Sequence, residues 1–265
     1  MPYEDYPIFT DPPESNKLWR YISLAKFESI LRKSALFFCR ADKFSDPFEG
    51  SSPDKEVEHR IEDERIIMKQ MGKKFDPNQA VKQAEMLSKF QRKLSSLVII
   101  NCWHFNTHES DAMWQLYLKD NEGIAIQTTS KKLQKCFAPT DYTVNAGKVR
   151  YLDYQNDIYY DQDQFQNVAY NVKTPFIHKR NHFKHEQEYR ALIEVETENG
   201  WEYDWGAEEY TKGKMIQIDV ETLIEKIIVP PNTNEKFANE VKKLISMYGY
   251  DFHVRKSEME KEPKF

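Results

Sequence analysis

The chain has 265 residues, with 43 acidic and 38 basic side chains and a formal net charge of −5. A dedicated nucleic-acid-binding protein usually carries a basic excess, so this charge counts against that class and leaves open only a local basic patch. Hydrophobic residues make up 40% of the chain, which is enough for a folded core, and only 8 glycines argue against a glycine-rich sandwich or a solenoid.

The cysteines and the apolar segments favour a cytoplasmic protein. Cys39, Cys102 and Cys136 are odd in number and lack metal-ligand spacing, which indicates reduced thiols rather than a disulfide framework. The first residues have neither the basic nor the apolar region of a signal peptide, and no apolar run approaches the length of a membrane span. We therefore expect a cytoplasmic protein that does not enter the membrane.

The first predicted elements are a strand, a helix and a second strand. The strands cover 18–23 and 35–40, and Ser23 can cap the helix between them, which has an apolar stripe. The loop that follows contains Asp46-Pro47, which forces a turn.

Residues 53–97 are charged and thinly apolar, and the pattern is broken near Gly72 and Pro77. This predicts a helical insertion made of a pair of surface helices. Two interpretations stay open: plain surface helices, or a lid or docking arm for a protein partner, because such insertions often carry function.

The middle of the chain alternates strands and short helices. Residues 97–105 predict a strand buried on both faces, and a short helix with Met113, Trp114 and Tyr117 precedes a strand at 124–129.

The C-terminal region shows the clearest pattern. Residues 215–230 have strand character throughout, and 201–210 predict a hairpin or a loop. An amphipathic helix capped at Asn232 or Thr233 then leads to a closing strand at 251–257. No linker divides the chain, so we expect one α+β domain over residues 1–265.

The segment KHEQEYRALIEV at 184–195 holds the main catalytic candidates. Strict alternation predicts one strand face that carries Glu186, Glu188 and Arg190, and an opposite face that is apolar. One of two neighbouring carboxylates can have a raised pKa and act as an acid or base. The alternative is a solvated face of an edge strand.

Charged and aromatic side chains elsewhere are candidates for binding a ligand. Arginine suits a diphosphate or carboxylate, and aromatic walls suit a planar ring. Structural explanations compete with each: an arginine that reaches the sheet edge, a turn held by aromatic packing, and aromatic side chains in the core. The candidates are Arg20, Tyr21, Ser23, Asp46, Phe48, Trp103, His104, Trp114, Tyr117 and Arg180.

Several common motifs are absent from the sequence. It contains no GxGxxG after a strand, no GxxxxGK[ST], no HExxH and no GxSxG. His104 and His108 are four residues apart, but His108 falls in a polar loop, so no metal site is predicted. Cys102 lies in an apolar strand and is expected to be inert core.

Four segments together resemble a widespread bacterial family known only as a domain of unknown function. They are LWRYIS with FSDPFEG, then MWQLYLKDNEGIAI, then HEQEYRALI, and finally IIVPPN with VRKS. Family members have roughly LYRY.S with FNDPFE, then MW..Y with G.AI, and then E.EYR. The resemblance covers about residues 18–258, and this chain has Ser45 where the family often has Asn.

The opening strand, helix and strand are also similar to the start of ADP-ribosyltransferase-like domains of the DarT type. That similarity implies a split mixed β-sheet flanked by helices, with NAD as substrate. It also implies that Glu188 stabilises an oxocarbenium-like sugar, while Glu186 selects or activates the acceptor. Arg20 would hold the diphosphate, and Trp114 or Tyr117 would line the nicotinamide side.

The sequence thus predicts a bacterial cytosolic ADP-ribosyltransferase-like enzyme, as a toxin or anti-phage defence effector, with nucleic acid among the candidate acceptors. One alternative is a non-catalytic nucleotide-sensing or partner-binding module. The other is a metal-dependent phosphodiesterase or nuclease built on four carboxylates, namely Asp46, Glu49, Glu186 and Glu188.

Overall fold

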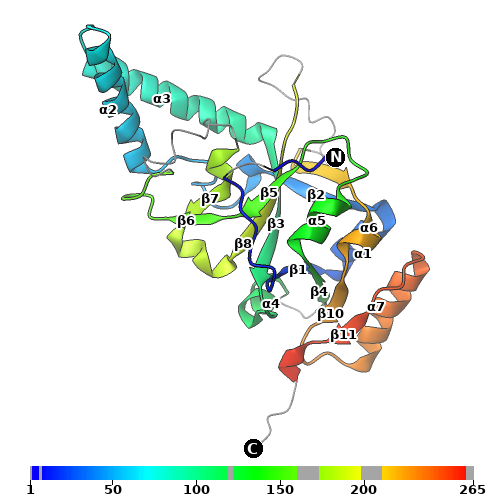
Figure 1. Ribbon diagram of the computed structural model, residues 1–265. Helices are drawn as coiled ribbons and strands as arrows, with labels where there is room; N and C mark the ends of the chain where they lie inside the picture. Colours follow the sequence, from blue (N-terminus) through cyan, green and yellow to red (C-terminus); the bar gives the residue numbers. More distant parts are fainter. Residues whose placement is uncertain (1, 6–7, 119–121, 160–172, 198–210, 261–265) are drawn as a thin grey trace, which may run out of the picture.

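The computed structural model describes residues 2–5, 8–118, 122–159, 173–197 and 211–260 (Figure 1). These residues form a large mixed β-sheet flanked by helices, and a second sheet of two strands. The predicted α+β class is confirmed. The expectation of one domain stays a prediction, and the hairpin or loop predicted at 201–210 lies outside the described residues.

The large sheet has nine strands in the described part of the chain, and all neighbours are antiparallel except β10 and β11. Its strands are β1 (Lys17–Ser23), β2 (Ala35–Arg40), β3 (Val98–Asn106), β4 (Gly123–Thr128), β5 (Asn145–Lys148), β8 (Glu188–Glu194), β9 (Gly213–Gln217), β10 (Lys226–Val229) and β11 (Val254–Lys256). The small sheet pairs β6 (Arg150–Leu152) with β7 (His178–Arg180) in parallel.

Strand β3 is the branch point of the sheet. One of its edges pairs with β8, and the other edge is shared by β1 and β2. The β1 ladder ends at Trp19 opposite His104, whereas the β2 ladder reaches only Cys39 opposite Ile100. The sheet is therefore divided along this edge of β3.

A side chain occupies part of that division. Asn101 of β3 donates its amide N–H to the carbonyl of Phe37 at 2.9 Å and accepts from the indole of Trp103 at 2.7 Å. Asn101 thus satisfies a backbone carbonyl of β2 where no ladder bond reaches it.

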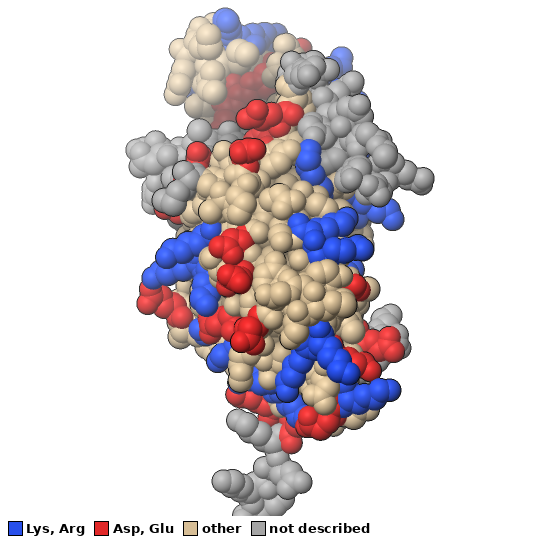
Figure 2. All heavy atoms as spheres, turned by 90° about the vertical axis from the view of Figure 1, so that its right-hand side faces the viewer, with Lys and Arg blue, Asp and Glu red and all other residues tan. Residues whose placement is uncertain are grey.

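Four helices cover one face of the sheet, namely α1 (Leu24–Lys33), α5 (Ser130–Cys136), α6 (Val220–Leu223) and α7 (Glu235–Met247). Their apolar stripes contribute buried residues such as Phe27, Leu133 and Val241 to the main core. A second apolar cluster, separate from the main core, contains Leu192 of the sheet together with Ile177. On the outer side of α7, acidic and basic side chains are interleaved (Figure 2).

Strand β8 is buried on both sides along most of its length. Tyr189, Ala191 and Ile193 belong to the main core, as the alternation predicts. Leu192, on the opposite side, belongs to the second apolar cluster. The edge-strand alternative is therefore wrong, because β8 is hydrogen-bonded to β3 and to β5.

The start of this strand differs from the prediction of a strand over 184–195. Residues Asn181–Glu186 form a 3₁₀ helix, η5, and Gln187 follows with φ of 40° in the left-handed region. Glu186 therefore precedes the strand instead of lying within it. The turn at Gln187 nevertheless brings Glu186 beside Glu188, since both carboxylates contact Lys179.

The C-terminal region also differs from its prediction. Residues 215–230 do not form continuous strand, because Asp219 caps the short helix α6 by accepting from the backbone N–H of Thr222 at 3.0 Å. The cap of α7 is Asn234, which accepts from Phe237, and not Asn232 or Thr233. The capping carboxylate of Asp219 thus favours the helix α6, although the apolar pattern of the sequence predicted strand there.

The charged segment 53–97 forms two helices, α2 (Asp54–Gln70) and α3 (Pro77–Leu94), which pack on each other and project from the rest of the protein (Figure 1). The helix pair was predicted, including the break near Gly72. None of the described helices is both long enough and apolar enough to cross a lipid bilayer.

Ser23 gives a direct test of the β1–α1 junction. Its hydroxyl accepts from the backbone N–H of Lys26 at 3.4 Å and caps α1. We expect Ser23→Ala to lower the free energy of unfolding by about 1 kcal/mol, because one helix donor loses its partner. Urea unfolding measures this change, and Ser246→Ala, on the exposed side of α7, is a control expected to be neutral or slightly stabilising.

Candidate functional site

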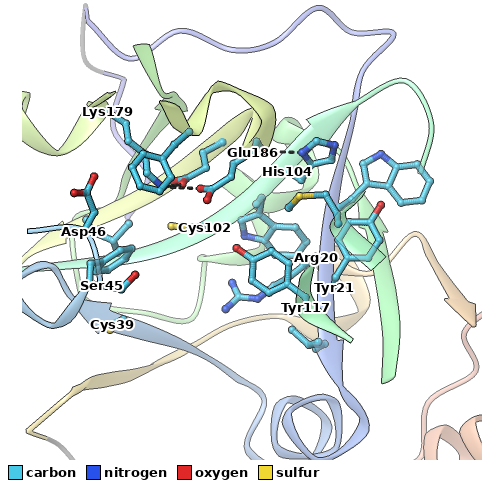
Figure 3. A pocket seen from close by; sticks show the side chains of 18 of the residues that line it. Arg20, Tyr21, Cys39, Ser45, Asp46, Cys102, His104, Tyr117, Lys179 and Glu186 are labelled. Atoms are coloured by element: carbon cyan, nitrogen blue, oxygen red, sulfur yellow. Dashed lines mark hydrogen bonds and ion pairs between the residues drawn. The ribbon is translucent and has the colours of Figure 1, made fainter. Parts of the chain in front are cut away.

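A cavity of about 430 Å³ lies where the sheet is divided. Strands β1, β2 and β3 contribute to its walls, and α1, the loop after β2, α4 (Asp111–Tyr117), β7, η5 and β8 complete them. In Figure 3, Arg20, Tyr21, His104 and Tyr117 lie on one side and Asp46 and Lys179 on the other, with Cys102 between them. The cavity is lined by Trp19, Arg20, Tyr21, Ile22, Lys26, Phe37, Cys39, Phe44, Ser45, Asp46, Glu49, Ile100, Cys102, Trp103, His104, Met113, Tyr117, Lys179, Phe183, Glu186 and Glu188.

Glu188, the first residue of β8, is held from three directions. Its carboxylate accepts from Lys179 at 2.5 Å and from Nε of Arg190 at 2.5 Å. Its backbone N–H donates to the hydroxyl of Tyr151 at 2.8 Å. These contacts fix the carboxylate at the wall of the cavity, with only 6% of the residue exposed.

Arg190 anchors this arrangement from behind. Its guanidinium is fully buried and binds both oxygens of Glu49, at 2.6 and 3.0 Å. It also donates to the carbonyl of Phe176 at 2.6 Å. Arg190 does not line the cavity, so the structure places this catalytic candidate in a positioning role behind Glu188.

The pKa values of the two glutamates are shifted in opposite directions. Burial alone would raise the pKa of Glu188, but Arg190, Glu186 and Lys179 outweigh it and lower that pKa below its ordinary value. Burial and then the neighbouring Glu188 raise the pKa of Glu186 to about 7, although Lys179 lies 2.6 Å from its carboxylate. At neutral pH, Glu188 is ionised and Glu186 is poised to take up or release a proton.

Arg20 supplies a cation from β1. Its guanidinium carbon lies 5.5 Å from the centre of the Trp103 ring, and its Nη1 is buried with no hydrogen-bond partner among the described residues. Burial lowers the pKa of Arg20 to about 10, so the side chain stays charged at neutral pH. A buried, charged donor without a partner is suited to an anionic ligand.

His104 presents an acceptor to the same cavity. Its Nδ1 lies 2.6 Å from the carbonyl of Glu186, and burial lowers the pKa of the imidazole, which favours the neutral ring. Nδ1 then carries the proton and donates to the carbonyl. Nε2 is left as a buried acceptor with no partner in the described part of the chain.

Of the residues predicted to bind a ligand, six line the cavity: Arg20, Tyr21, Asp46, Trp103, His104 and Tyr117. The other four lie outside its walls. Ser23 caps α1, Trp114 is buried and donates to Glu109 at 3.1 Å, and Arg180 binds Asp46 at 2.6 Å while it stacks on Phe48 at 4.1 Å. Ser23, Trp114 and Arg180 therefore make contacts within the local structure. Phe48 packs against the guanidinium of Arg180.

Lys179 is the main site residue that the candidate set lacks. It bridges both glutamates from β7 in the small sheet, seven residues before Glu186 and outside the β8 alternation that pointed to the acids. Glu49, in the turn after Asp46-Pro47, is paired with Arg190 through a contact that no local pattern reveals. Cys102 lines the cavity, and burial raises the pKa of its thiol, which keeps it protonated.

The carboxylates proposed for a metal site are occupied by cations of the protein. Glu49 and Glu188 bind Arg190, and Asp46 binds Arg180. Within the described ranges, no three side chains of the metal-binding types come close enough to hold an ion.

Comparison with known proteins gives a family match over part of the chain. The model of a family described as "Protein of unknown function (DUF2971)" matches residues 113–191. The predicted resemblance to a family of unknown function is confirmed over this segment. The segment begins at Met113 of the MW..Y motif and ends directly after Arg190 of E.EYR.

A solved structure is also similar to the chain. It is the Thermus sp. 2.9 DarT in complex with ADP-ribosylated single-stranded DNA, with 10% identity and a TM-score of 0.39. The match covers 96% of this chain and 100% of that one. No curated protein matches the sequence.

The raised pKa of Glu186 predicts a dependence of stability on pH. A group whose folded pKa is about 7 and whose ordinary value is 4.5 binds a proton more tightly in the folded state. Its contribution is complete below pH 4.5 and is lost as the pH rises to 7. The stability of the wild type relative to Glu186→Gln should therefore fall between pH 4.5 and 7.

Urea unfolding at several pH values measures this difference. Glu194→Gln, an exposed carboxylate at the other end of β8, is the control. A wild-type advantage over Glu186→Gln that is constant or grows across this range would contradict the assignment.

Proposed function

We propose that this chain binds NAD in the cavity and transfers its ADP-ribosyl group to an acceptor. One observation carries the proposal: a single cavity holds the ionised carboxylate of Glu188 and the guanidinium of Arg20, whose Nη1 has no hydrogen-bond partner among the described residues. The similarity of the opening strands to ADP-ribosyltransferase-like domains agrees with this function.

The chemistry of NAD suits both charges. Its diphosphate is an anion that Arg20 can bind, and its nicotinamide ribose develops positive charge when the glycosidic bond breaks. Trp103 and Tyr117 give aromatic walls for planar rings, and a cavity of about 430 Å³ lies within the range of small-molecule sites. The hydroxyl groups of the ribose can donate to Nε2 of His104.

The proposed step is a substitution at C1′ of the nicotinamide ribose. The bond from C1′ to the pyridinium nitrogen breaks, and its electron pair leaves with neutral nicotinamide. Glu188 stabilises the cationic sugar electrostatically, because its carboxylate stays ionised in a water-poor site. The acceptor then forms a bond to C1′, and its proton passes to Glu186, whose pKa of about 7 suits a base.

The alternatives receive less support from the site. A metal-dependent nuclease needs carboxylate oxygens that converge on an ion, whereas these oxygens bind Arg180, Arg190 and Lys179. A non-catalytic sensor would use the same cavity, and it is distinguished by binding without nicotinamide release. A toxin or anti-phage effector with nucleic acid among its acceptors stays our working hypothesis for the biological role.

Nicotinamide release from NAD tests the role of Glu188. We expect Glu188→Gln to reduce the rate at least about 100-fold, because the amide lacks the charge that stabilises the cationic sugar. Glu194→Gln, on the same strand but exposed, should retain the wild-type rate. Wild-type protein that binds NAD and releases no nicotinamide, with or without candidate acceptors, would favour the sensor.

Binding measurements test the role of Arg20. We expect Arg20→Gln to weaken NAD binding about 10- to 100-fold, as expected for a lost charge-assisted hydrogen bond. Binding of nicotinamide riboside, which has no phosphate, should change little. Lys33→Gln is the matched control and should leave NAD binding unchanged, since Lys33 is an exposed cation of α1 outside the lining of the cavity. An equal loss for both ligands would rule out the diphosphate contact.

A further inference from the structure

The turn at 46–51, in the loop after β2, lies between the cavity and the helix pair in the chain. It is closed by its own hydrogen bonds. The backbone N–H of Glu49 donates to the carbonyl of Asp46 at 3.0 Å, and the N–H of Ser51 donates to the carbonyl of Phe48 at the same distance. Within this turn, Glu49 binds the guanidinium of Arg190 with both carboxylate oxygens. The position of the turn therefore determines where Arg190 is held.

A close contact at Gly50 fixes the turn. Gly50 has a φ of 74°, in the left-handed region that glycine adopts without strain. A Cβ atom at Gly50 would lie 2.2 Å from Cε1 of Phe176, so the ring of Phe176 packs directly against the backbone of the turn. The carbonyl of Phe176 accepts from Arg190 at 2.6 Å. This contact therefore joins two segments that both bind Arg190.

Gln91 of α3 holds the same glycine from the helix pair. Its side-chain N–H donates to the carbonyl of Gly50 at 2.6 Å, and its side-chain oxygen accepts from the hydroxyl of Ser52 at 3.0 Å. Arg60 of α2 donates to that hydroxyl at 3.1 Å. The Ser52 contact orients the amide of Gln91 so that its nitrogen faces Gly50. Both helices of the pair thus contact the residues directly after Glu49.

These contacts make a continuous path from the helix pair to the site. Gln91 binds Gly50, and the neighbouring Glu49 binds Arg190. Arg190 then donates to Glu188 at 2.5 Å. No residue of α2 or α3 lines the cavity, so an effect of the helix pair on the site has to pass through such contacts. Charge-assisted hydrogen bonds depend on short, directed geometry, so a shift of the turn also shifts Arg190.

We propose that Gln91 is a positioning residue, which holds the Gly50 turn and thereby fixes the carboxylate of Glu188 at the cavity wall. The inference rests on the proposed ADP-ribosyl transfer, in which that carboxylate has to be held close to C1′ of the ribose. Gln91 itself touches no ligand. When its hydrogen bond is lost, Glu49 shifts with the turn and Arg190 holds Glu188 less firmly. The effect falls on the catalytic step and not on NAD binding.

Steady-state kinetics of nicotinamide release by the full chain test this role. Gln91→Leu removes the donor, and Gln91→Glu keeps the shape of the side chain but cannot donate to Gly50. We expect each variant to lower kcat about 10-fold, because a catalytic group is displaced, and to leave KM within about twofold. Gln70→Leu and Gln70→Glu make the same changes at the exposed end of α2 and should retain the wild-type kcat.

Hydrogen exchange at Arg190 tests the same role without NAD. The Nε–H of Arg190 is buried and donates to Glu188, so its NMR signal should exchange slowly with solvent. In both Gln91 variants, we expect exchange at least about 10-fold faster than their change in unfolding free energy accounts for. A residue that only stabilises the fold would produce no such excess, and the Gln70 variants should show none.

The two measurements separate this inference from the proposed function. Faster exchange in the Gln91 variants, with no nicotinamide release from the wild type, would contradict the reaction and support the hold on Arg190. Nicotinamide release by the wild type with an unchanged kcat in both Gln91 variants would overturn the positioning role. Exchange at Arg190 that is unchanged in both Gln91 variants would also overturn it.

Discussion

The site depends on the burial of one negative charge. Glu188 keeps its carboxylate ionised inside the protein only because Arg190 and Lys179 contact it from two elements. Removing an ion from water costs several kcal/mol, so such a charge is tolerated only where cations and hydrogen bonds compensate. Glu49 extends the compensation by binding the far side of Arg190. Four charged groups thereby tie β7, β8 and the loop after β2 into one rigid wall.

This network explains the acid, acid and base at the start of β8. Glu186 faces the cavity, Glu188 forms its wall and Arg190 is buried behind, so each of the three has a different environment. The environments separate the two carboxylates, one held ionised and the other titrating near neutrality. A pair divided in this way can stabilise a cation with one group and move a proton with the other.

Local patterns in the sequence predicted the α+β class, the helix pair and the proximity of Glu186 and Glu188. Each rests on periodicity or on neighbours along the chain. The contact of Lys179 with both glutamates could not be predicted, because it depends on how β7 of the small sheet lies relative to the start of β8. Arg190 and Glu49 are 141 residues apart, and no local pattern joins them. Ser23 and Trp114 were misplaced because capping and core packing use the same residue types as ligand binding.

The division of the sheet is itself maintained by one side chain. Asn101 reaches from β3 to the carbonyl of Phe37. Its side-chain amide therefore joins the two strands where main-chain hydrogen bonds join them elsewhere in the sheet. An apolar residue of similar size would orphan that carbonyl and also the Trp103 indole. The separation of β2 and β3 at this point therefore depends on the length of the Asn101 side chain. Evolution could widen or narrow the ligand chamber by altering this position without rebuilding any strand.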